Sequence, residues 1–128
     1  MISTSDYFMG RDKTHASELT QAIRDNAAVT VARVNGLLSE AKVQTTVSSG
    51  WRPPAVNAAT KGAAKKSKHM TGEACDLRDP KGDLGRWCLE NLDVLERHQL
   101  WLEHPSRTQG WVHLQIRPPN SGSRVFYP

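Results

Sequence analysis

A histidine and an aspartate flank a glycine in the segment SKHMTGEACDLRD, which spans residues 67–79. The three residues are His69, Gly72 and Asp76. Imidazole nitrogens and carboxylate oxygens are common zinc ligands, and glycine can adopt the positive φ that a tight turn between the two ligands would need. The same residues would also suit a polar loop that leads into a strand. A metal site is therefore predicted only if a third ligand reaches the same place.

Strand parity supplies that third ligand. The segments EACDLRD and WVHLQIR are both expected to form strands, in which successive side chains face opposite sides. The apolar neighbours of Asp76 and of His113 are expected to face the core, which puts Asp76 and His113 on the other face. If the two strands are adjacent, these side chains meet, and His69 can return over the same spot. Two imidazoles, one carboxylate and an open position for water are the arrangement of a catalytic zinc.

Three segments of the chain resemble the zinc D-alanyl-D-alanine carboxypeptidases and L-alanyl-D-glutamate endopeptidases. SKHMTGEACD is similar to the Ser-x-His-x-x-Gly-x-Ala-x-Asp signature of that family, WVH to its later Trp-x-His segment, and SGWRPPAVN to its Ser-Gly-aromatic-Arg element. The resemblance covers most of the chain, in the family's order. It implies the small α+β fold that bacterial cell-wall peptidases share with the Hedgehog signalling domain.

The resemblance also implies a role for each matching residue. His69, Asp76 and His113 would be the zinc ligands. Arg52 would hold a substrate carboxylate through a charge-assisted pair, and Ser67 would hydrogen-bond the substrate close to the first ligand. Zinc would lower the pKa of its bound water and polarise the scissile carbonyl.

Hydrolysis further requires a carboxylate that takes the proton from that water. Many family members place it three residues before the last ligand, where this chain has Gly110. We predict that Glu103 is the base, because it lies on the strand face opposite Leu100 and Leu102, and because compact phage-type members similarly carry a Glu before the loop that leads to Trp-x-His. Glu73 is the second candidate, although its side chain is expected to point to solvent.

The surroundings of the site are less specific. Trp111 shares a strand face with His113 and would either line the cleft or only fill space. The basic loop KGAAKKSK leads into His69 and could attract the carboxylates of a peptide stem. His15, His98 and His104 are expected to be loop or surface residues.

The period of apolar residues predicts the elements that position the site. A stripe of apolar residues predicts a long helix that starts after Thr20 and runs to Leu38. We expect a strand over residues 43–48, a long loop from 55 to the first histidine ligand, a second helix capped by Asp83, and strands at 99–103 and 111–117. Residues 1–18 are expected to be an irregular lead-in whose Tyr7, Phe8 and Met9 pack on the domain, and residues 118–128 a coil.

These elements predict an α+β fold with helices packed on one face of a small, mainly antiparallel sheet. Residues 1–128 are enough for one domain. Cys75 and Cys88 are expected to be buried thiols, and a net charge of +4 suits an anionic partner. Because no apolar run resembles a signal peptide or a bilayer span, we expect synthesis in the host cytoplasm and no stable membrane insertion. The resemblance implies action on the cell wall, and we further expect a monomer.

The predicted function is a zinc-dependent peptidase of peptidoglycan stem peptides, first of all an L-alanyl-D-glutamate endopeptidase of the endolysin type. A D-Ala-D-Ala carboxypeptidase and a non-catalytic, zinc-containing wall-binding module are the alternatives. A nucleic-acid binder ranks last, because the chain contains no recognised binding motif.

Overall fold

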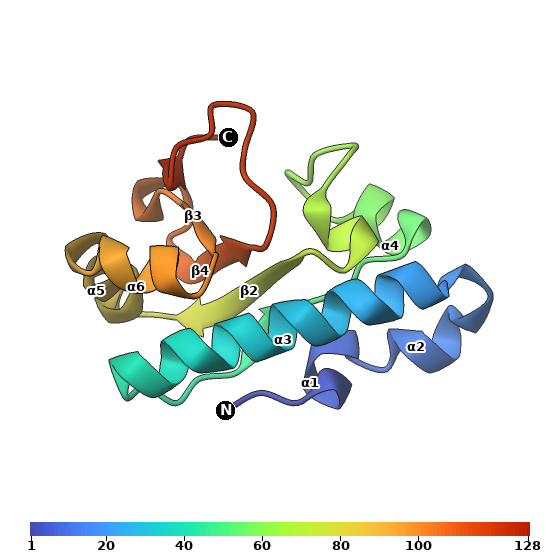
Figure 1. The fold of residues 1–128 in the computed structure, drawn as a ribbon. Coiled ribbons are helices and arrows are strands. Elements are labelled where there is room, and N and C mark those ends of the chain that lie inside the picture. The colour runs from blue at the N-terminus through green and yellow to red at the C-terminus, as the bar shows by residue number, and fades with distance from the viewer.

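A five-stranded sheet forms the centre of the fold in the computed structural model, which describes residues 1–128 (Figure 1). Its strand order is β1-β2-β4-β3-β5. The strands β1, β2, β4 and β3 pair antiparallel, and only β3 and β5 are parallel. The predicted α+β fold with a mainly antiparallel sheet is therefore confirmed. The strand bounds are Val47–Ser49 (β1), Ala74–Asp79 (β2), Trp101–Glu103 (β3), Gly110–Gln115 (β4) and Val125–Phe126 (β5).

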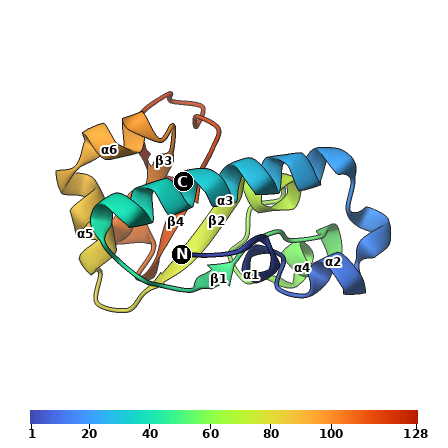
Figure 2. The same ribbon diagram turned by 60° about the horizontal axis from the view of Figure 1, so that its bottom comes forward.

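The long helix α3 (Gln21–Ala41) lies along the sheet (Figures 1 and 2). The hydroxyl of Thr20 accepts a hydrogen bond from the backbone N–H of Ile23 at 3.2 Å, so the predicted start of the helix is confirmed. The apolar stripe of α3 belongs to the same buried core as the inward-facing side chains of β2 and β4. Thr30, on that stripe, donates to the carbonyl of Gly72 at 2.7 Å and ties the helix to the turn before β2.

The N-terminal segment is more regular than predicted. It contains the helices α1 (Thr4–Phe8) and α2 (Arg11–Thr14) and the 3₁₀ helix η1 (Ala16–Glu18). Ser3 and Asp6 form a capping box at the start of α1, which explains why so short a helix forms there. Tyr7 and Phe8 are buried as predicted, and the sulfur of Met9 accepts from the backbone N–H of Gly50 at 3.4 Å. Met9 ends α1 in the left-handed conformation (φ 56°) and stays 40% exposed.

Four further expectations about the elements need correction. The expected long loop contains the helix α4 (Pro54–Ala59) and the 3₁₀ helix η2 (Lys68–Thr71), and the expected C-terminal coil contributes β5. The second helix is divided into α5 (Asp83–Glu90) and α6 (Leu92–Arg97), and η3 (Pro105–Arg107) follows β3. The N-cap residue of α5 is Gly82 rather than Asp83, and the carboxylate of Asp79 accepts from the backbone N–H groups of Leu84 (3.1 Å) and Gly85 (2.9 Å). No helix combines the length and the apolar character needed to cross a bilayer.

Gly50, directly after β1, lies against the backbone of Tyr7 in the N-terminal segment. A Cβ at this position would lie 1.8 Å from the backbone carbonyl oxygen of Tyr7. Replacing Gly50 by Ala should therefore lower the free energy of unfolding by about 1–3 kcal/mol, because the backbone must shift to remove the overlap. Chemical denaturation measures the effect, with the exposed Ser48→Ala as a control that should stay close to the wild type. A G50A variant as stable as the wild type would show that the two segments are not in contact.

Candidate metal centre

Asp76 and His113 face each other across the strands β2 and β4. The register pairs Asp76 directly with His113, while the neighbouring pairs Cys75–Leu114 and Leu77–Val112 are fully buried in the core. Because side chains alternate along a strand, Asp76 and His113 lie together on the opposite face of the sheet. The parity argument from the sequence is confirmed.

His69 reaches the same place from the 3₁₀ helix η2. Gly72 ends this helix with φ 77°, so the chain turns back into β2 at the glycine that the sequence indicated. His69 Nε2 lies 3.2 Å from Asp76 Oδ1, and His113 Nδ1 lies 2.9 Å from the same oxygen. One ligand atom from each of the three residues falls within 4.8 Å of the others. The three predicted ligands therefore converge.

The hydrogen bond made by His69 Nδ1, the ring nitrogen that does not face Asp76, fixes the tautomer of His69. His69 Nδ1 lies 2.8 Å from the carbonyl oxygen of Gly50, which can only accept a hydrogen bond. Nδ1 must therefore carry a hydrogen. In the neutral imidazole this leaves a lone pair on Nε2, the nitrogen that points at Asp76.

A second chain of hydrogen bonds fixes the tautomer of His113. The side-chain N–H₂ of Gln115 donates to the carbonyl of Arg117 at 2.9 Å, which orients the amide so that its oxygen faces His113 Nε2, also at 2.9 Å. Nε2 must then carry the hydrogen, and the lone pair of the neutral ring lies on Nδ1. Two imidazole lone pairs and a carboxylate oxygen thus point at one place, which fits the chemistry of a zinc site.

Burial and mutual interaction shift the pKa values of Asp76, His69 and His113. Burial alone would raise the pKa of Asp76, but the charge of His69 and the hydrogen bonds from both histidines hold it below its usual range. Burial lowers the pKa of His69, whereas Asp76 raises the pKa of His113 in spite of burial. A metal that uses His113 Nδ1 must displace the proton shared with Asp76, so metal and proton compete for this atom.

Replacing Gln115 by Leu should weaken zinc binding by roughly 10- to 100-fold, because His113 then loses the acceptor that fixes its ring. Gln115→Glu keeps an acceptor at that position and should retain most of the affinity. Competition with a chromogenic chelator measures both variants, and the melting temperature of the metal-free proteins controls for folding. Equal zinc affinity of Q115L and wild type would show that Gln115 does not orient His113.

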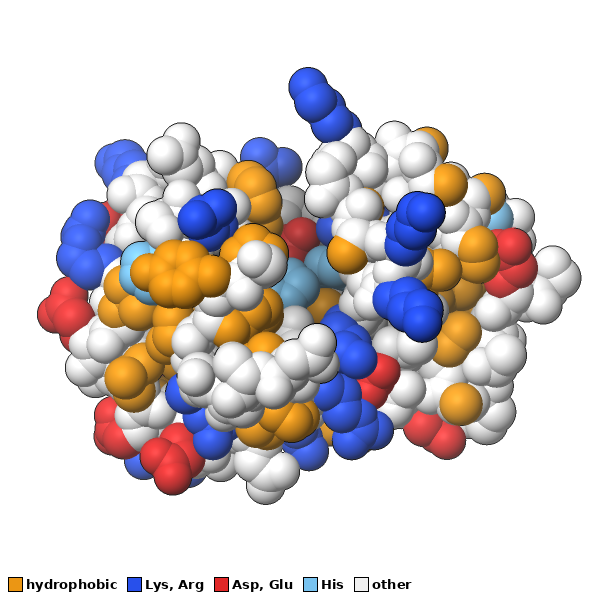
Figure 3. All heavy atoms as spheres, turned by 90° about the horizontal axis from the view of Figure 1, so that it is seen from above, with side chains coloured by type: hydrophobic (Ala, Val, Ile, Leu, Met, Phe, Trp, Pro, Cys, Tyr) orange, Lys and Arg blue, Asp and Glu red, His pale blue; other side chains and the backbone are white.

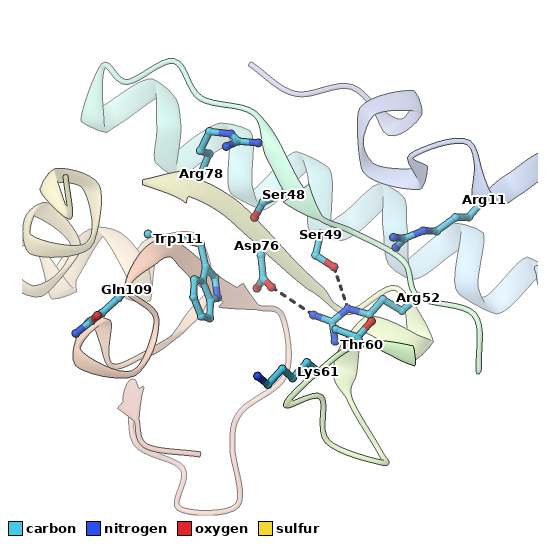
Figure 4. A pocket seen from close by; sticks show the side chains of 11 residues that line it. Arg11, Ser48, Ser49, Arg52, Thr60, Lys61, Asp76, Arg78, Gln109 and Trp111 are labelled. Atoms are coloured by element: carbon cyan, nitrogen blue, oxygen red, sulfur yellow. Dashed lines mark hydrogen bonds and ion pairs between the residues drawn. The ribbon is translucent and has the colours of Figure 1, made fainter. Parts of the chain in front are cut away.

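Asp76 also lines a cavity of about 420 Å³ that opens to solvent. In Figure 3, histidine side chains lie at the bottom of a groove, and Lys and Arg side chains lie around it. Figure 4 shows the lining side chains around Asp76. Most of the lining residues are polar or basic, and the full set is Arg11, Ser48, Ser49, Arg52, Thr60, Lys61, Asp76, Arg78, Gln109, Gly110 and Trp111.

Arg52 enters this cavity from the segment after β1 and is only 8% exposed. Its guanidinium donates to Ser49 Oγ (2.9 Å), Asn57 Oδ1 (3.2 Å) and Asp76 Oδ2 (3.4 Å). Asn57 is itself fixed, because its amide donates to the carbonyl of Ala64 at 2.9 Å. The sequence drew attention to Arg52, but the side chains that hold it in place are visible only in the structure.

Glu103 lies next to the ligands on the neighbouring strand. β3 and β4 pair Trp101 with Gln115 and Leu102 with Leu114, so one step further along the register places Glu103 opposite His113. Burial raises the pKa of the Glu103 carboxyl, which also lies within electrostatic range of His113 and Asp76. This position suits the predicted base, and the catalytic role stays a prediction.

The second candidate base has a different environment from the one predicted. Glu73 does not point to solvent: it is 8% exposed, and its carboxylate accepts from the hydroxyl of Thr71 and from the guanidinium of Arg117. The reason is that the side chain of Arg117, just beyond β4, reaches Glu73, the residue before β2. Glu73 therefore ties η2 and β2 to the end of β4.

The remaining predicted residues are placed as follows. Ser67 caps η2, since its hydroxyl accepts from the backbone N–H of His69 at 3.1 Å, and its contact with substrate stays a prediction. Trp111 is 37% exposed and lines the cavity, which agrees with the first of its two predicted roles, lining the cleft rather than only filling space. Cys75 and Cys88 are buried free thiols, as expected.

Comparison with known proteins agrees with this geometry. The sequence model of one family, peptidase M15, matches residues 9–115 and so contains all three ligands together with Arg52 and Glu103. No curated protein and no solved structure matches the chain. The match extends over most of the 128 residues, and the donor set fits the metal that these peptidases use. The chain therefore belongs to the peptidase M15 family and is a zinc metallopeptidase.

Proposed function

We propose that this zinc peptidase hydrolyses the L-alanyl-D-glutamate bond of peptidoglycan stem peptides, as endolysin-type enzymes do. Membership of the M15 family supports a peptidase that acts on peptidoglycan. The observation that carries the proposal is the convergence of His69 Nε2, Asp76 Oδ1 and His113 Nδ1 beside an open, basic cavity. Stem peptides carry carboxylates, so the charge of this cavity is complementary to them.

The residues around the ligands supply the other parts of a hydrolytic site. Zinc, when bound, lowers the pKa of water and polarises the scissile carbonyl. Glu103 would take the proton of the attacking water and pass it to the leaving amine. Arg52, which is fixed by Ser49 and Asn57, would hold a substrate carboxylate with the N–H groups that those contacts leave free.

The distribution of side chains along the cavity favours cleavage inside a peptide over removal of its last residue. In Figure 4, Trp111 and Gln109 lie on one side of Asp76, and Arg52 and Arg11 lie on the other. A peptide that continues past the scissile bond in both directions would have contacts on both sides. This arrangement supports the endopeptidase over the D-Ala-D-Ala carboxypeptidase.

Digestion of purified cell walls, with and without a chelator, tests the proposal. The expected result is a zinc-dependent release of fragments whose new termini, identified by mass, are L-Ala and D-Glu. Release of D-Ala would instead establish a carboxypeptidase. Zinc-loaded protein that binds walls and cuts none of their bonds would establish a non-catalytic module.

A further inference from the structure

Two guanidinium groups lie at the same end of the cavity. Arg52 comes from the segment after β1, and Arg11 comes from α2 in the N-terminal segment (Figure 4). One nitrogen of Arg11, Nη1, donates to the backbone carbonyl of Trp51 at 2.9 Å, which anchors the side chain beside Arg52. Arg11 forms no ion pair with any carboxylate of the protein. Its other N–H groups are therefore free to bind a ligand.

The side chains that line the cavity carry a net positive charge. Four cations line the cavity, namely Arg11, Arg52, Lys61 and Arg78, and Asp76 is the one carboxylate among the lining residues. That carboxylate already contacts Arg52 and two histidines. The two guanidiniums line the same end of the cavity (Figure 4), and burial together with the charge of Arg52 lowers the pKa of Arg11. An anion between them would offset the repulsion of their charges.

We propose that Arg11 and Arg52 together form an anion subsite that binds one free carboxylate of the stem peptide. The inference rests on the proposed function and adds a substrate-binding residue from outside the segments that carry the zinc ligands. Planar guanidiniums match the geometry of a carboxylate and bind it with paired, charge-assisted hydrogen bonds. The N-terminal segment, through α2, thus helps to select substrates whose carboxylate is free over those in which it is an amide.

A set of synthetic stem peptides tests the subsite. The carboxylates are either all free or converted to amides one at a time, and kcat/KM is measured for each peptide. For the wild type, one particular amide should reduce kcat/KM by about tenfold, the effect of one good charge-assisted contact. Arg11→Gln should show a similar loss with the all-carboxylate peptide and little further loss with that amide.

Two other variants separate a local contact from general electrostatics. Lys13→Gln removes the same charge from an exposed position on α2 outside the cavity, and should behave like the wild type with every peptide. Arg78→Gln removes a charge from the cavity but lies apart from Arg52 (Figure 4), so it should keep the wild-type response to that amide. Zinc content and melting temperature of R11Q control for loss of the contact with Trp51, and Arg11→Lys should restore part of the selectivity.

The experiments test the proposed reaction and the carboxylate-binding role of Arg11 separately. If the wild type cuts none of the peptides, the proposed function is wrong, and calorimetric binding of the same peptides to the zinc-loaded protein still tests Arg11. Weaker binding of only the free-carboxylate peptide by R11Q would support the subsite. An equal loss with free and amidated peptides, or no loss with either, would overturn it.

Discussion

Replacing Glu103 by Gln should lower kcat for stem-peptide hydrolysis by roughly 10²- to 10⁴-fold, because the amide cannot accept the proton of the attacking water. Zinc content and substrate binding should stay near wild type, since Glu103 is not among the converging ligands. Steady-state kinetics on one defined peptide, together with metal analysis of the same preparation, measure both quantities. A large loss of kcat at full zinc occupancy is the result expected of a base.

Glu73→Gln is the informative comparison for this variant. It changes the other candidate carboxylate, which is engaged with Thr71 and Arg117 rather than exposed. We expect E73Q to lose stability and to keep its turnover within a few-fold of the wild type once it is folded. If E73Q loses turnover at full zinc occupancy while E103Q keeps it, the assignment of the base is reversed.

Replacing His69 by Ala should remove measurable zinc binding and hydrolysis together. The ring supplies one of three protein ligands, and its Nδ1 contact with Gly50 goes with it. The loss should also appear as stability: zinc at 1,000 times its dissociation constant stabilises a protein by about 4 kcal/mol. Thermal unfolding with added zinc should therefore shift upward for the wild type and stay unchanged for H69A.

His15→Ala is a suitable control for that measurement. It also removes an imidazole, but from the end of α2 outside the cavity. H15A should bind zinc, respond to it in thermal unfolding and hydrolyse substrate as the wild type does. An H69A variant that still gained stability from zinc to the same extent would contradict the role of His69 as a ligand.

The ligands were predictable because their arrangement depends on local rules. Alternation along β2 and β4 determines the faces of Asp76 and His113, and a glycine between His69 and Asp76 permits the turn that brings the third ligand back. The same alternation restricts the register of the two strands, since a slip by one residue would turn Asp76 into the core. Alternation alone does not make β2 and β4 neighbours, because that pairing joins residues as far apart along the chain as Asp76 and His113.

The rest of the site depends on contacts between distant segments. Arg11 lies in a stretch without apolar period, and its position is set by a hydrogen bond to Trp51, forty residues away. Gln115 shares a strand face with His113, but its role follows from the direction of its amide, which the carbonyl of Arg117 determines. Asp83 is the local candidate for capping α5, but the carboxylate that accepts from the first N–H groups of this helix belongs to Asp79, at the end of β2.

The most direct test of the metal centre is a crystal structure of the zinc-loaded protein, with anomalous data at the zinc edge. The expected map shows one zinc bound by His69 Nε2, Asp76 Oδ1 and His113 Nδ1, with its remaining coordination position toward the cavity. A zinc bound elsewhere, or these three side chains turned away from a common centre, would contradict the account.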